Sequence, residues 1–509
     1  MELYTIKDVE LVDSEIDTIT EKIENKKRDI FEPTRKTITD INKVVMDFVK
    51  EHKRKIYGGY AQNKLILIKN PEDAFYGEDE IPDIDVYSPE PIKDLVELCN
   101  LLHKKGFSSV SGQEAVHPET YKVFVSGYNA IDLSYVPRNI YNRIPFIEVD
   151  GINYVHPSFI YIDLYRILTD PYFSGSHRWK KVFPRLYKLQ KHYPFNKATK
   201  PLNNAYDVPN DKREIVNKIN RILIDIIKNK ENFIIVGQYA YNYLLEASDI
   251  MKDKRLGSKY KLIPIPFMQI ISTNYIPDTV NIILKLKEMY GDKISHKEFY
   301  GLWMYTAYNT VLYYDNFAIL HITGHNNRCV PIRKVETKYY DNGKSILDTN
   351  KNSFVQLGSF DFIFLMNLIS GLRVRVNGVE DKQHYHNIMT SQLIEIRNYY
   401  LEKNKKTLLD DSLFKSFIEN CVGETMDPMQ ESRILRDKKK KEGKLVVFRY
   451  NPENPKEAPD YKFANTSGNE INKSRNLKIQ KYLDNPKLLE EFNKKSYDEK
   501  IEEVEDESE

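Results

Sequence analysis

"KIYGGYAQNKLIL" at residues 55–67 and "FIIVGQYAYNYLL" at residues 233–245 are two versions of one phrase. In each version a short apolar run ends at a glycine, and a longer run containing a Tyr-Ala pair follows. This order predicts a strand, a tight turn and the beginning of a helix. The second version also has a glycine at the first position of the turn, where Gly237 corresponds to Gly58. At the next position it has Gln238, where the first version has Gly59.

The similarity extends to both sides of the phrase. Residues 32–56 and 211–231 each carry apolar residues at three- and four-residue spacing, which predicts an amphipathic helix before each turn. Downstream the matches are "IPDIDVYS" (81–88) with "IPFMQIIS" (265–272), "YNAIDLSYV" (128–136) with "DNFAILHIT" (315–323), and "SFIYIDLYRIL" (158–168) with "SFDFIFLMNLI" (359–369). We therefore expect an α/β (α+β) protein with two tandem domains of one fold, each a mixed β-sheet flanked by helices.

Composition excludes several classes of protein. No apolar run is long enough to span a bilayer, and the charged N-terminus lacks a signal-peptide core, so a soluble, intracellular protein that is not secreted is expected. Cys99, Cys329 and Cys421 are far apart and show no CxxC spacing, so we expect reduced thiols rather than disulfides or a zinc site. The net charge is only +2, so a nucleic-acid surface would have to be local.

Three aspartates are the candidate metal ligands. Asp83 and Asp85 stand two apart in a β-like run, so both should point to one face of the sheet. Asp132, in the alternating run "AIDLSYV", could add a third carboxylate from a neighbouring strand. Oxygen ligands of this kind suit Mg²⁺, and three carboxylates can hold two metal ions. Surface carboxylates at strand ends are the alternative.

The second copy of the phrase favours metal binding by these aspartates. Asp83 becomes Phe267 and Asp85 becomes Gln269, and with Ala130-Ile131 laid on Ala318-Ile319 Asp132 becomes Leu320, while the apolar frame persists. Purely structural carboxylates would have no reason to disappear together. The first copy is therefore the expected catalytic domain, with Gly58 and Gly59 placing backbone N–H groups and a helix N-terminus near phosphates. The second copy is expected to be degenerate.

The order strand, Gly-Gly, helix, Asp-x-Asp and a later strand Asp resembles the nucleotidyltransferase superfamily of DNA polymerase β type. Within it the chain is most similar to the poxvirus-type poly(A) polymerase catalytic subunit, in its large-DNA-virus (mimivirus-like) branch. The similarity lies in "YGGYAQNKL", "IPDIDVYS", "AIDLSYVPRNIYNRIPF" and "GSHRWKKVFPRLYKL".

This resemblance implies template-independent addition of AMP from ATP to an mRNA 3′ end, with Mg²⁺ or Mn²⁺ held by Asp83, Asp85 and Asp132. It also implies nucleotide binding at Gly58 and Gly59. Tyr60 departs from the superfamily, since many members have Ser or Thr there, so a hydroxyl contact to the γ-phosphate is in doubt at this position.

A basic and aromatic segment supplies further binding candidates. In "GSHRWKKVFPRLYKLQKHYP" (175–194), basic residues alternate with aromatic ones, which fits a surface for phosphates and stacked bases. An amphipathic helix with a solvated basic face explains the segment equally well. The candidates are, for nucleotide, Ser134, Tyr60, Arg178, Lys180 and Lys181, and for RNA, Arg178, Lys181, Arg185 and Lys188.

The expected organisation is an N-terminal arm (1–34), a catalytic domain (35–200), a degenerate domain (201–430) and a charged, solvated tail (431–509). Expected partners are the mRNA 3′ end and ATP, with a homodimer or a separate processivity subunit and no membrane. The resemblance suggests a cytoplasmic viral factory or the virion as location. The alternatives are an enzyme making CCA ends, oligouridine tails or a cyclic dinucleotide, and a non-catalytic RNA-binding scaffold.

Overall fold

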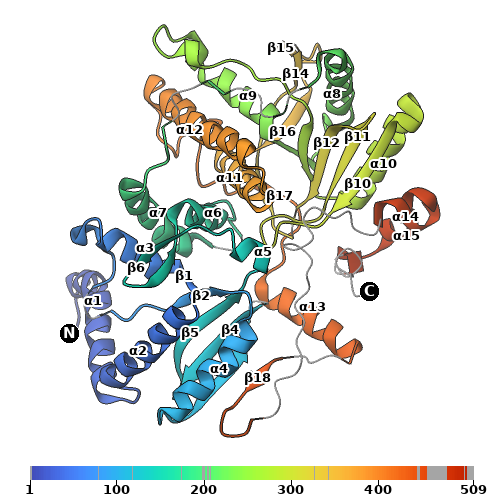
Figure 1. The fold of residues 1–509 in the computed structure, drawn as a ribbon. Helices are drawn as coiled ribbons and strands as arrows, with labels where there is room; N and C mark the ends of the chain where they lie inside the picture. The colour runs from blue at the N-terminus through green and yellow to red at the C-terminus, as the bar shows by residue number, and fades with distance from the viewer. Residues whose placement is uncertain are drawn as a thin grey trace. The chain divides into compact units, whose positions relative to one another are not determined.

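The computed structural model forms two compact units. The first unit comprises Met1–Val136, Ile144–His156 and Leu435–Phe463, and the second comprises Pro137–Arg143, Pro157–Ile434 and Ala464–Glu509. The residues that the structure describes are 3–77, 80–116, 119–172, 175–197, 201–202, 206, 208–325, 327–341, 343–443, 447–455, 478–497 and 499–500. Each unit contains a mixed β-sheet with helices packed on it (Figure 1), as expected.

The sheet of the first unit has the strand order β18-β3-β4-β5-β2-β1-β7-β6. Its strands are β1 (Lys55–Tyr57), β2 (Asp85–Ser88), β3 (Val110–Glu114), β4 (Thr120–Val125), β5 (Tyr128–Tyr135), β6 (Phe146–Val149), β7 (Ile152–Val155) and β18 (Arg449–Tyr450). The β2–β5 and β1–β7 pairs are parallel and the other pairs are antiparallel. The helices are α1 (Ile6–Ile30), α2 (Arg35–Glu51), α3 (Gly58–Leu67) and α4 (Pro91–Lys104).

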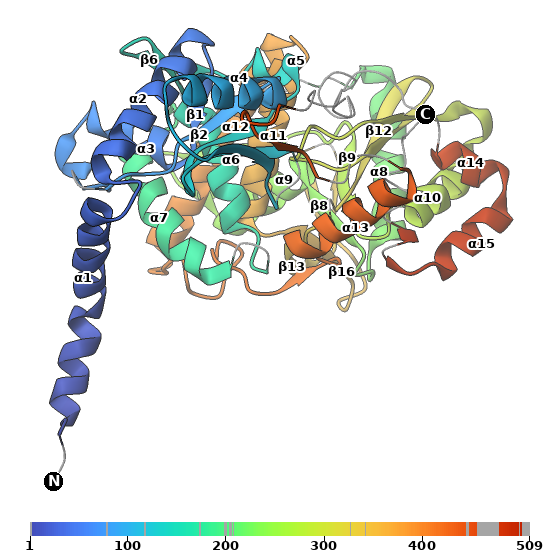
Figure 2. The same cartoon turned by 90° about the horizontal axis from the view of Figure 1, so that it is seen from below.

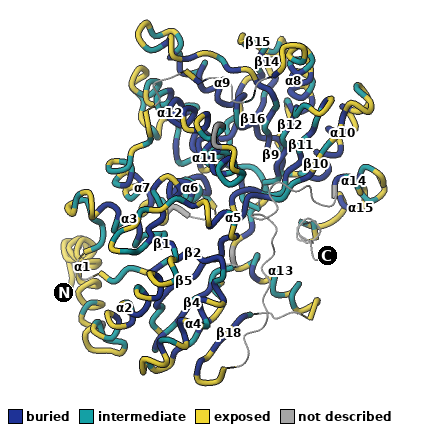
Figure 3. The backbone as a smooth tube through the Cα atoms, viewed as in Figure 1, coloured by how far each residue is buried: buried dark blue, intermediate teal, exposed yellow. Residues whose placement is uncertain are grey.

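The predicted apolar stripe of α2 is buried, with Ile41, Val45 and Phe48 almost fully enclosed. This burial fixes the helix on the sheet, because each side chain of this kind contributes roughly 1.5–3 kcal/mol when enclosed. By contrast α1 extends away from the sheet of its unit (Figure 2), and most of its length is exposed, as its yellow colour shows in Figure 3.

The sheet of the second unit repeats the first in the order β10-β11-β12-β9-β8-β16-β13-β17. Its strands are β8 (Phe233–Val236), β9 (Met268–Ser272), β10 (Ile294–Phe299), β11 (Asn309–Tyr314), β12 (Phe317–Gly324), β13 (Val330–Glu336), β16 (Phe354–Gly358) and β17 (Cys421–Val422), with β14 (Lys338–Asp341) and β15 (Lys344–Leu347) as a separate hairpin. Its main helices are α8 (Arg213–Ile227), α9 (Gly237–Ser248), α10 (Tyr275–Tyr290), α11 (Phe360–Val376) and α12 (Glu380–Lys403).

Residues 157–200, expected to complete the first domain, differ from that expectation. Their helices α6 (Pro157–Leu168) and α7 (Gly175–His192) belong to the second unit, as does the short α5 (Arg138–Tyr141). The Tyr165 ring packs on Phe364 of α11 at 4.8 Å, and Trp179 packs on Phe417 at 5.3 Å. Contacts between residues so distant in sequence decide the division, and no periodicity in the sequence reveals them.

The described parts of 431–509 are folded, which corrects the expectation of a solvated tail. They contain most of α13 (Pro428–Lys441), then β18, α14 (Lys478–Asp484) and α15 (Pro486–Lys494). Strand β18 adds to the edge of the first sheet, where Tyr450 pairs with Gly112, and the preceding Phe448 is fully buried. In the second unit the backbone N–H of Ile479 donates to the buried Glu298. The acidic end, 501–509, lies outside the described residues.

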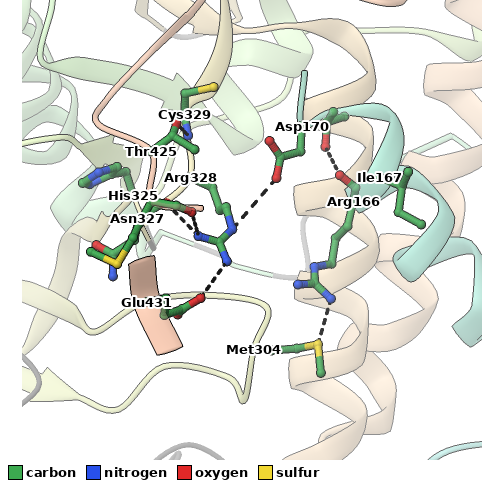
Figure 4. Close-up of polar contacts among 12 residues, drawn as sticks. Arg166, Ile167, Asp170, Met304, His325, Asn327, Arg328, Cys329, Thr425 and Glu431 are labelled. Carbon is green, nitrogen blue, oxygen red and sulfur yellow. Dashed lines mark hydrogen bonds and ion pairs between the residues drawn. The ribbon is translucent and has the colours of Figure 1, made fainter. Parts of the chain in front are cut away.

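The expectation of three reduced thiols is wrong for two of them, because Cys329 and Cys421 form a disulfide. The antiparallel pairing of β13 with β17 brings these cysteines together across 92 residues of sequence, which their spacing could not reveal. Next to Cys329, Arg328 contacts Glu431 at 3.2 Å and Asp170 at 4.0 Å (Figure 4). Arg328 also donates to the Met426 carbonyl. Only Cys99 agrees with the expectation, as a buried free thiol.

A buried Ser–Asp pair recurs at the start of one helix in each unit. In the first unit Asp94 accepts hydrogen bonds from Ser88 and, through both carboxylate oxygens, from Arg54 at 2.7 Å. In the second unit Asp278 accepts from Ser272 and from the neutral Asn232 amide. Burial outweighs these two bonds and raises the pKa of Asp278 to about 6.

The raised pKa of Asp278 makes stability depend on pH. The folded protein keeps this proton up to about pH 6, whereas an unfolded aspartic acid releases it near pH 4. The free energy of unfolding should therefore fall by about 2–3 kcal/mol as the pH rises from about 4 to about 6. Asp278→Asn, neutral throughout, should lack this fall. Denaturant unfolding of both proteins across this range measures it, and parallel pH profiles would contradict the assignment.

Candidate active site

The turn after β1 brings a carboxylate against the first helical turn of α3. Gly58 has a φ of +69°, a conformation that favours glycine. A Cβ atom at Gly58 would lie only 2.2 Å from Oδ2 of Asp85, so the missing side chain is what lets this carboxylate approach the turn. The helix N-terminus, with its unsatisfied backbone N–H groups, is therefore adjacent to Asp85.

Two of the predicted aspartates are direct neighbours in the sheet. Strands β2 and β5 are parallel, and their register pairs Asp85 with Asp132. Asp83 lies just before β2, where Ile84 is still in register because its carbonyl accepts a bond from the Asp132 N–H at 2.9 Å. Asp83 is exposed, Ile84 is buried and Asp85 is partly buried, an alternation that fits Asp83 and Asp85 leaving the same face.

Donors from the chain itself surround Asp132. Lys122 Nζ lies 2.6 Å from Oδ2 and 2.9 Å from Oδ1 of Asp132, and Asn129 Nδ2 donates to Oδ1 at 2.7 Å. Among the residues that the structure describes, no three carboxylate, histidine or cysteine side chains converge as a metal-binding group. Lys122 instead holds the Asp132 carboxylate in an ion pair.

The donor set nevertheless fits a divalent cation. Asp85 and Asp132 offer carboxylate oxygens from adjacent strands on one face, and Asp83 is the next residue along that face. Oxygen donors of this kind are what Mg²⁺ and Mn²⁺ prefer. A positive charge is already present at Asp132 in the form of Lys122. The carboxylate oxygens on this face therefore match the ligand preference of these ions.

The predicted nucleotide contacts beside the aspartates are mostly engaged with protein groups. Ser134 is nearly buried, and its hydroxyl hydrogen bonds to Tyr57 at 2.8 Å and to Thr120 at 3.2 Å. Tyr57 also stacks on Tyr87 with ring centroids 3.8 Å apart. The ring centroids of Tyr60 and Tyr154 are 6.4 Å apart, and burial raises the pKa of the Tyr60 phenol. These groups brace the face of the sheet, and direct contact of Ser134 or Tyr60 with nucleotide stays a prediction.

The second unit shows which residues replace the aspartates, and it corrects one assignment. Strand β9 pairs with β12 so that Gln269 lies opposite His321, as Asp85 lies opposite Asp132. The counterpart of Asp132 is therefore His321 and not Leu320. The two hairpins correspond residue for residue, with the β-bulge after Val123 in one and after Leu312 in the other, so the match of Ala130-Ile131 with Ala318-Ile319 in the sequence was one residue out of register.

The residues that replace Asp85 and Asp132 in the second unit, Gln269 and His321, are both uncharged. Burial, reinforced by the nearby Arg373 guanidinium, lowers the pKa of His321 to about 3, so its ring is neutral near pH 7. The register places Val311 opposite His321, where the first unit has Lys122 opposite Asp132. The aspartate and its lysine are thus both absent from this copy. The pattern is that of a site that no longer needs to hold a cation.

The glycine turn of the second unit explains the phrase that differs between the copies. Gly237 has a φ of +67°, and a Cβ atom there would lie 1.8 Å from Oε1 of Gln269, so this glycine is still required. The next residue, Gln238, is buried close to Tyr385. A large side chain therefore occupies the helix N-terminus that Gly59 leaves without one in the first unit.

The basic segment forms the amphipathic helix α7. Val182, Leu186 and Leu189 form its buried face, while Arg178, Lys180 and Lys181 are exposed and Arg185 and Lys188 are partly exposed. Trp179 donates from Nε1 to the Ile167 carbonyl and packs on Phe417. The tryptophan is thus partly buried and engaged by protein groups, and α7 belongs to the second unit rather than to the unit of the aspartates. The roles of these basic residues in binding stay predictions.

Lys122 and Asn129 are the candidate functional residues that sequence reasoning missed. The hairpin turn Ser126-Gly127 between two alternating strands was a signal for antiparallel pairing. Regular pairing from that turn would set Lys122 opposite Ile131. Because of the bulge at Val123/Phe124, Lys122 lies opposite Asp132 instead, and no pattern in the sequence predicts this bulge.

Comparisons with known proteins identify the family of this chain. Residues 43–174 match the family "Poly(A) polymerase catalytic subunit", and residues 211–481 match the C-terminal domain family of the mimivirus poly(A) polymerase catalytic subunit. An Acanthamoeba polyphaga mimivirus protein named as a poly(A) polymerase catalytic subunit is 34% identical over 496 residues, covering 92% of this chain and 83% of that protein.

Two further similarities support the first. A protein of African swine fever virus with the same name is 31% identical over 169 residues, which is 32% of this chain and 35% of that protein. The crystal structure of the Megavirus polyadenylate synthase is 31% identical and superposes with a TM-score of 0.83, covering 94% of both chains.

Proposed function

Because this chain belongs to the poly(A) polymerase catalytic subunit family, we propose that it adds AMP from ATP to the 3′ end of mRNA without a template. The predicted family, the two-sheet fold and the enzyme class are confirmed by the comparisons. The observation that carries the proposed site is the pairing of Asp85 with Asp132 beside the Gly58 turn at the N-terminus of α3. The loss of this arrangement in the second unit supports it.

The three aspartates have distinct roles in the proposal. Asp83 and Asp85 hold two Mg²⁺ or Mn²⁺ ions together with the triphosphate, and Asp132 completes the site on the side of the RNA 3′-hydroxyl. Two divalent ions at such a site lower the pKa of the attacking hydroxyl and stabilise the departing pyrophosphate. The N-terminus of α3, opened by Gly58 and Gly59, receives the β- and γ-phosphates through backbone N–H groups.

Selection of ATP distinguishes this proposal from other nucleotidyltransferases. The purified protein should extend a labelled oligo(A) primer with ATP and Mg²⁺ or Mn²⁺, and much less with GTP, CTP or UTP. Preference for CTP or UTP would overturn the poly(A) assignment. No turnover of any of the four nucleotides would restore the scaffold alternative.

The basic face of α7 is the proposed contact for RNA phosphates, through Arg178, Lys181, Arg185 and Lys188. Lys180 is proposed to act with Arg178 and Lys181 on the triphosphate. Within the described residues, no helix is long and apolar enough to cross a membrane. The relatives are viral proteins, and we propose a cytoplasmic viral factory or the virion as the place of action.

The family name, catalytic subunit, implies a further subunit, and we propose that helix α1 also pairs with a second copy of this chain. Its apolar residues repeat every three and four positions, the heptad pattern of a coiled coil. Their side chains are 45–50% exposed, although this pattern normally becomes buried. They are Val9, Val12, Ile16, Ile19 and Ile23.

Charge favours an antiparallel pair. Residues 6–17 contain five acidic residues and one lysine, whereas 18–30 contain four basic and three acidic residues. Antiparallel pairing sets Glu15 of one copy opposite Lys22 of the other, at the positions that flank a coiled-coil seam. Parallel pairing would instead set Lys22 opposite Lys27. A second copy, running in the opposite direction, is therefore the partner that fits this helix.

Replacing Ile16 and Ile19 with lysine should convert the dimer to a monomer, because four charges would meet in the seam. The double variant Ser14→Lys, Thr18→Lys is the matched control, since both positions face away from the seam. Sedimentation equilibrium of the three proteins tests this. A wild-type monomer, or an unchanged mass in the Ile16 and Ile19 variant, would contradict pairing through α1.

A further inference from the structure

An ion pair occupies the carboxylate that the proposed function assigns to a metal ion. Lys122 on β4 and Asp132 on β5 are directly opposite in the antiparallel register. The ammonium contacts both oxygens of Asp132, at 2.6 and 2.9 Å. The Lys122 side chain is 30% exposed and that of Asp132 is 16% exposed, so solvent screens the pair only in part.

The position of this pair next to Asp85 gives the lysine a specific electrostatic role. Asp85 is the register neighbour of Asp132 on the opposite side, so β5 carries a carboxylate flanked by a carboxylate and an ammonium. Two neighbouring carboxylates repel each other unless a cation lies near them. In the protein without bound metal or substrate, Lys122 supplies that positive charge at Asp132.

The second unit indicates that the lysine belongs to the metal site rather than to the hairpin. The hairpin of β11 and β12 keeps the strand lengths, the two-residue turn and the bulge of the first copy. It has Val311 in place of Lys122, next to the neutral His321. The hairpin therefore folds without a lysine at this position. The lysine is present only in the copy that also has the aspartate.

We propose that Lys122 is a positioning residue that holds Asp132 in the metal-free enzyme and releases it when a divalent cation binds. This inference rests on the proposed function, in which Asp132 is a metal ligand. The ammonium has to leave because both oxygens of Asp132 already face it, and a divalent cation bound to either oxygen would repel it strongly at this distance.

The contacts allow such an exchange. Lys122 is attached through a flexible four-carbon stem and is partly exposed, so its head group can turn away without backbone movement. Asn129 is neutral, and its bond to Oδ1 can keep the carboxylate oriented during the exchange. Once released, the ammonium remains on the face that carries Asp85 and that the proposed function assigns to the substrate triphosphate.

Chemical labelling of lysines in the wild-type protein tests the release directly. Acetylation of Lys122, read from its peptide by mass spectrometry, should rise severalfold when Mn²⁺ is added without nucleotide. Lys64 is the internal control, because its side chain is also in an ion pair, with Asp150, and is 29% exposed, close to the 30% of Lys122. Its labelling should not change. Equal labelling of Lys122 with and without bound Mn²⁺ would overturn the inference.

Two substitutions should change Mn²⁺ affinity in opposite directions. Lys122→Met removes the competing cation and should bind Mn²⁺ about fivefold more tightly. Lys122→Arg keeps the charge and pairs more firmly with a carboxylate through its planar fork, so it should bind Mn²⁺ more weakly than wild type. A lysine that only supports the fold would give weaker binding in both variants. Titration of Mn²⁺ followed by electron paramagnetic resonance measures the affinity of the wild-type protein and of both variants.

Asp132→Asn separates failure of this inference from failure of the proposed function. If this variant binds Mn²⁺ as wild type does, Asp132 is not a ligand and the proposed function loses that assignment. If Asp132→Asn loses Mn²⁺ while the labelling of Lys122 in wild type is insensitive to Mn²⁺, the ligand assignment stands and the release of Lys122 is wrong.

Discussion

Replacement of Asp83 and Asp85 with alanine is expected to lower AMP incorporation about a thousandfold or more, while RNA binding persists. The two carboxylates hold the ions that stabilise charge in the transition state, and electrostatic stabilisation of this kind is commonly the largest catalytic contribution. Primer extension with ATP measures the activity, and a filter-binding assay with labelled RNA measures the binding. Extension at a near-normal rate by the double variant would refute the assignment.

The duplication offers a matched control for this experiment. Gln269 is the counterpart of Asp85, at the same register position beside the equivalent glycine turn. Gln269→Ala should leave AMP incorporation within about threefold of wild type, because an amide at this position holds no cation. A large loss of activity in this variant would mean that the second unit takes part in the chemistry.

The second large effect is expected for Gly58→Ala. The new methyl group would lie 2.2 Å from Oδ2 of Asp85, in a residue whose φ of +69° already disfavours a side chain. The carboxylate has to move, and a displacement of this size typically costs about a hundredfold in rate. The backbone strain should add roughly 1–2 kcal/mol of destabilisation. Steady-state extension assays and thermal unfolding measure the two effects.

Gly237→Ala separates catalytic displacement from strain. Its φ of +67° and its contact of 1.8 Å with Gln269 Oε1 impose the same steric conflict in the second unit. It should therefore destabilise the protein to a similar extent but retain activity below the unfolding temperature. Equal losses of activity in the two variants would contradict a special role for the Gly58 turn.

Local patterns in the sequence predicted the parts of the fold that local interactions determine. The α2 stripe, the strand–glycine–helix turn and the recurrence of both in the second copy follow from residue periodicity and from the φ that glycine permits. The division at 200, the folded parts of 431–509 and the Cys329–Cys421 disulfide depend on contacts between distant segments. Those contacts have no signature in any single window of sequence.

In the candidate site, too, the sequence predicted the general arrangement but not which single residues correspond or pair. The aspartates could be chosen because three carboxylates disappear together in the copy. The exact counterpart of Asp132 could not, since matching the two Ala-Ile dipeptides shifts the copies by one residue, whereas the strand register makes His321, and not Leu320, its counterpart. The bulge at Val123/Phe124 concealed Lys122, whose side chain meets Asp132 only in the register that the bulge creates. To predict which side chains are neighbours across the strands, the register must be known, and the register depends on the position of the bulge.

Anomalous diffraction from crystals soaked with Mn²⁺ and a non-hydrolysable ATP analogue tests the central claim, that the first unit alone holds the catalytic metal ions. The account predicts Mn²⁺ peaks at Asp83, Asp85 and Asp132, and none beside Gln269 and His321 in the second unit. A Mn²⁺ peak beside Gln269 and His321, or bound analogue with no Mn²⁺ at the three aspartates, would contradict it.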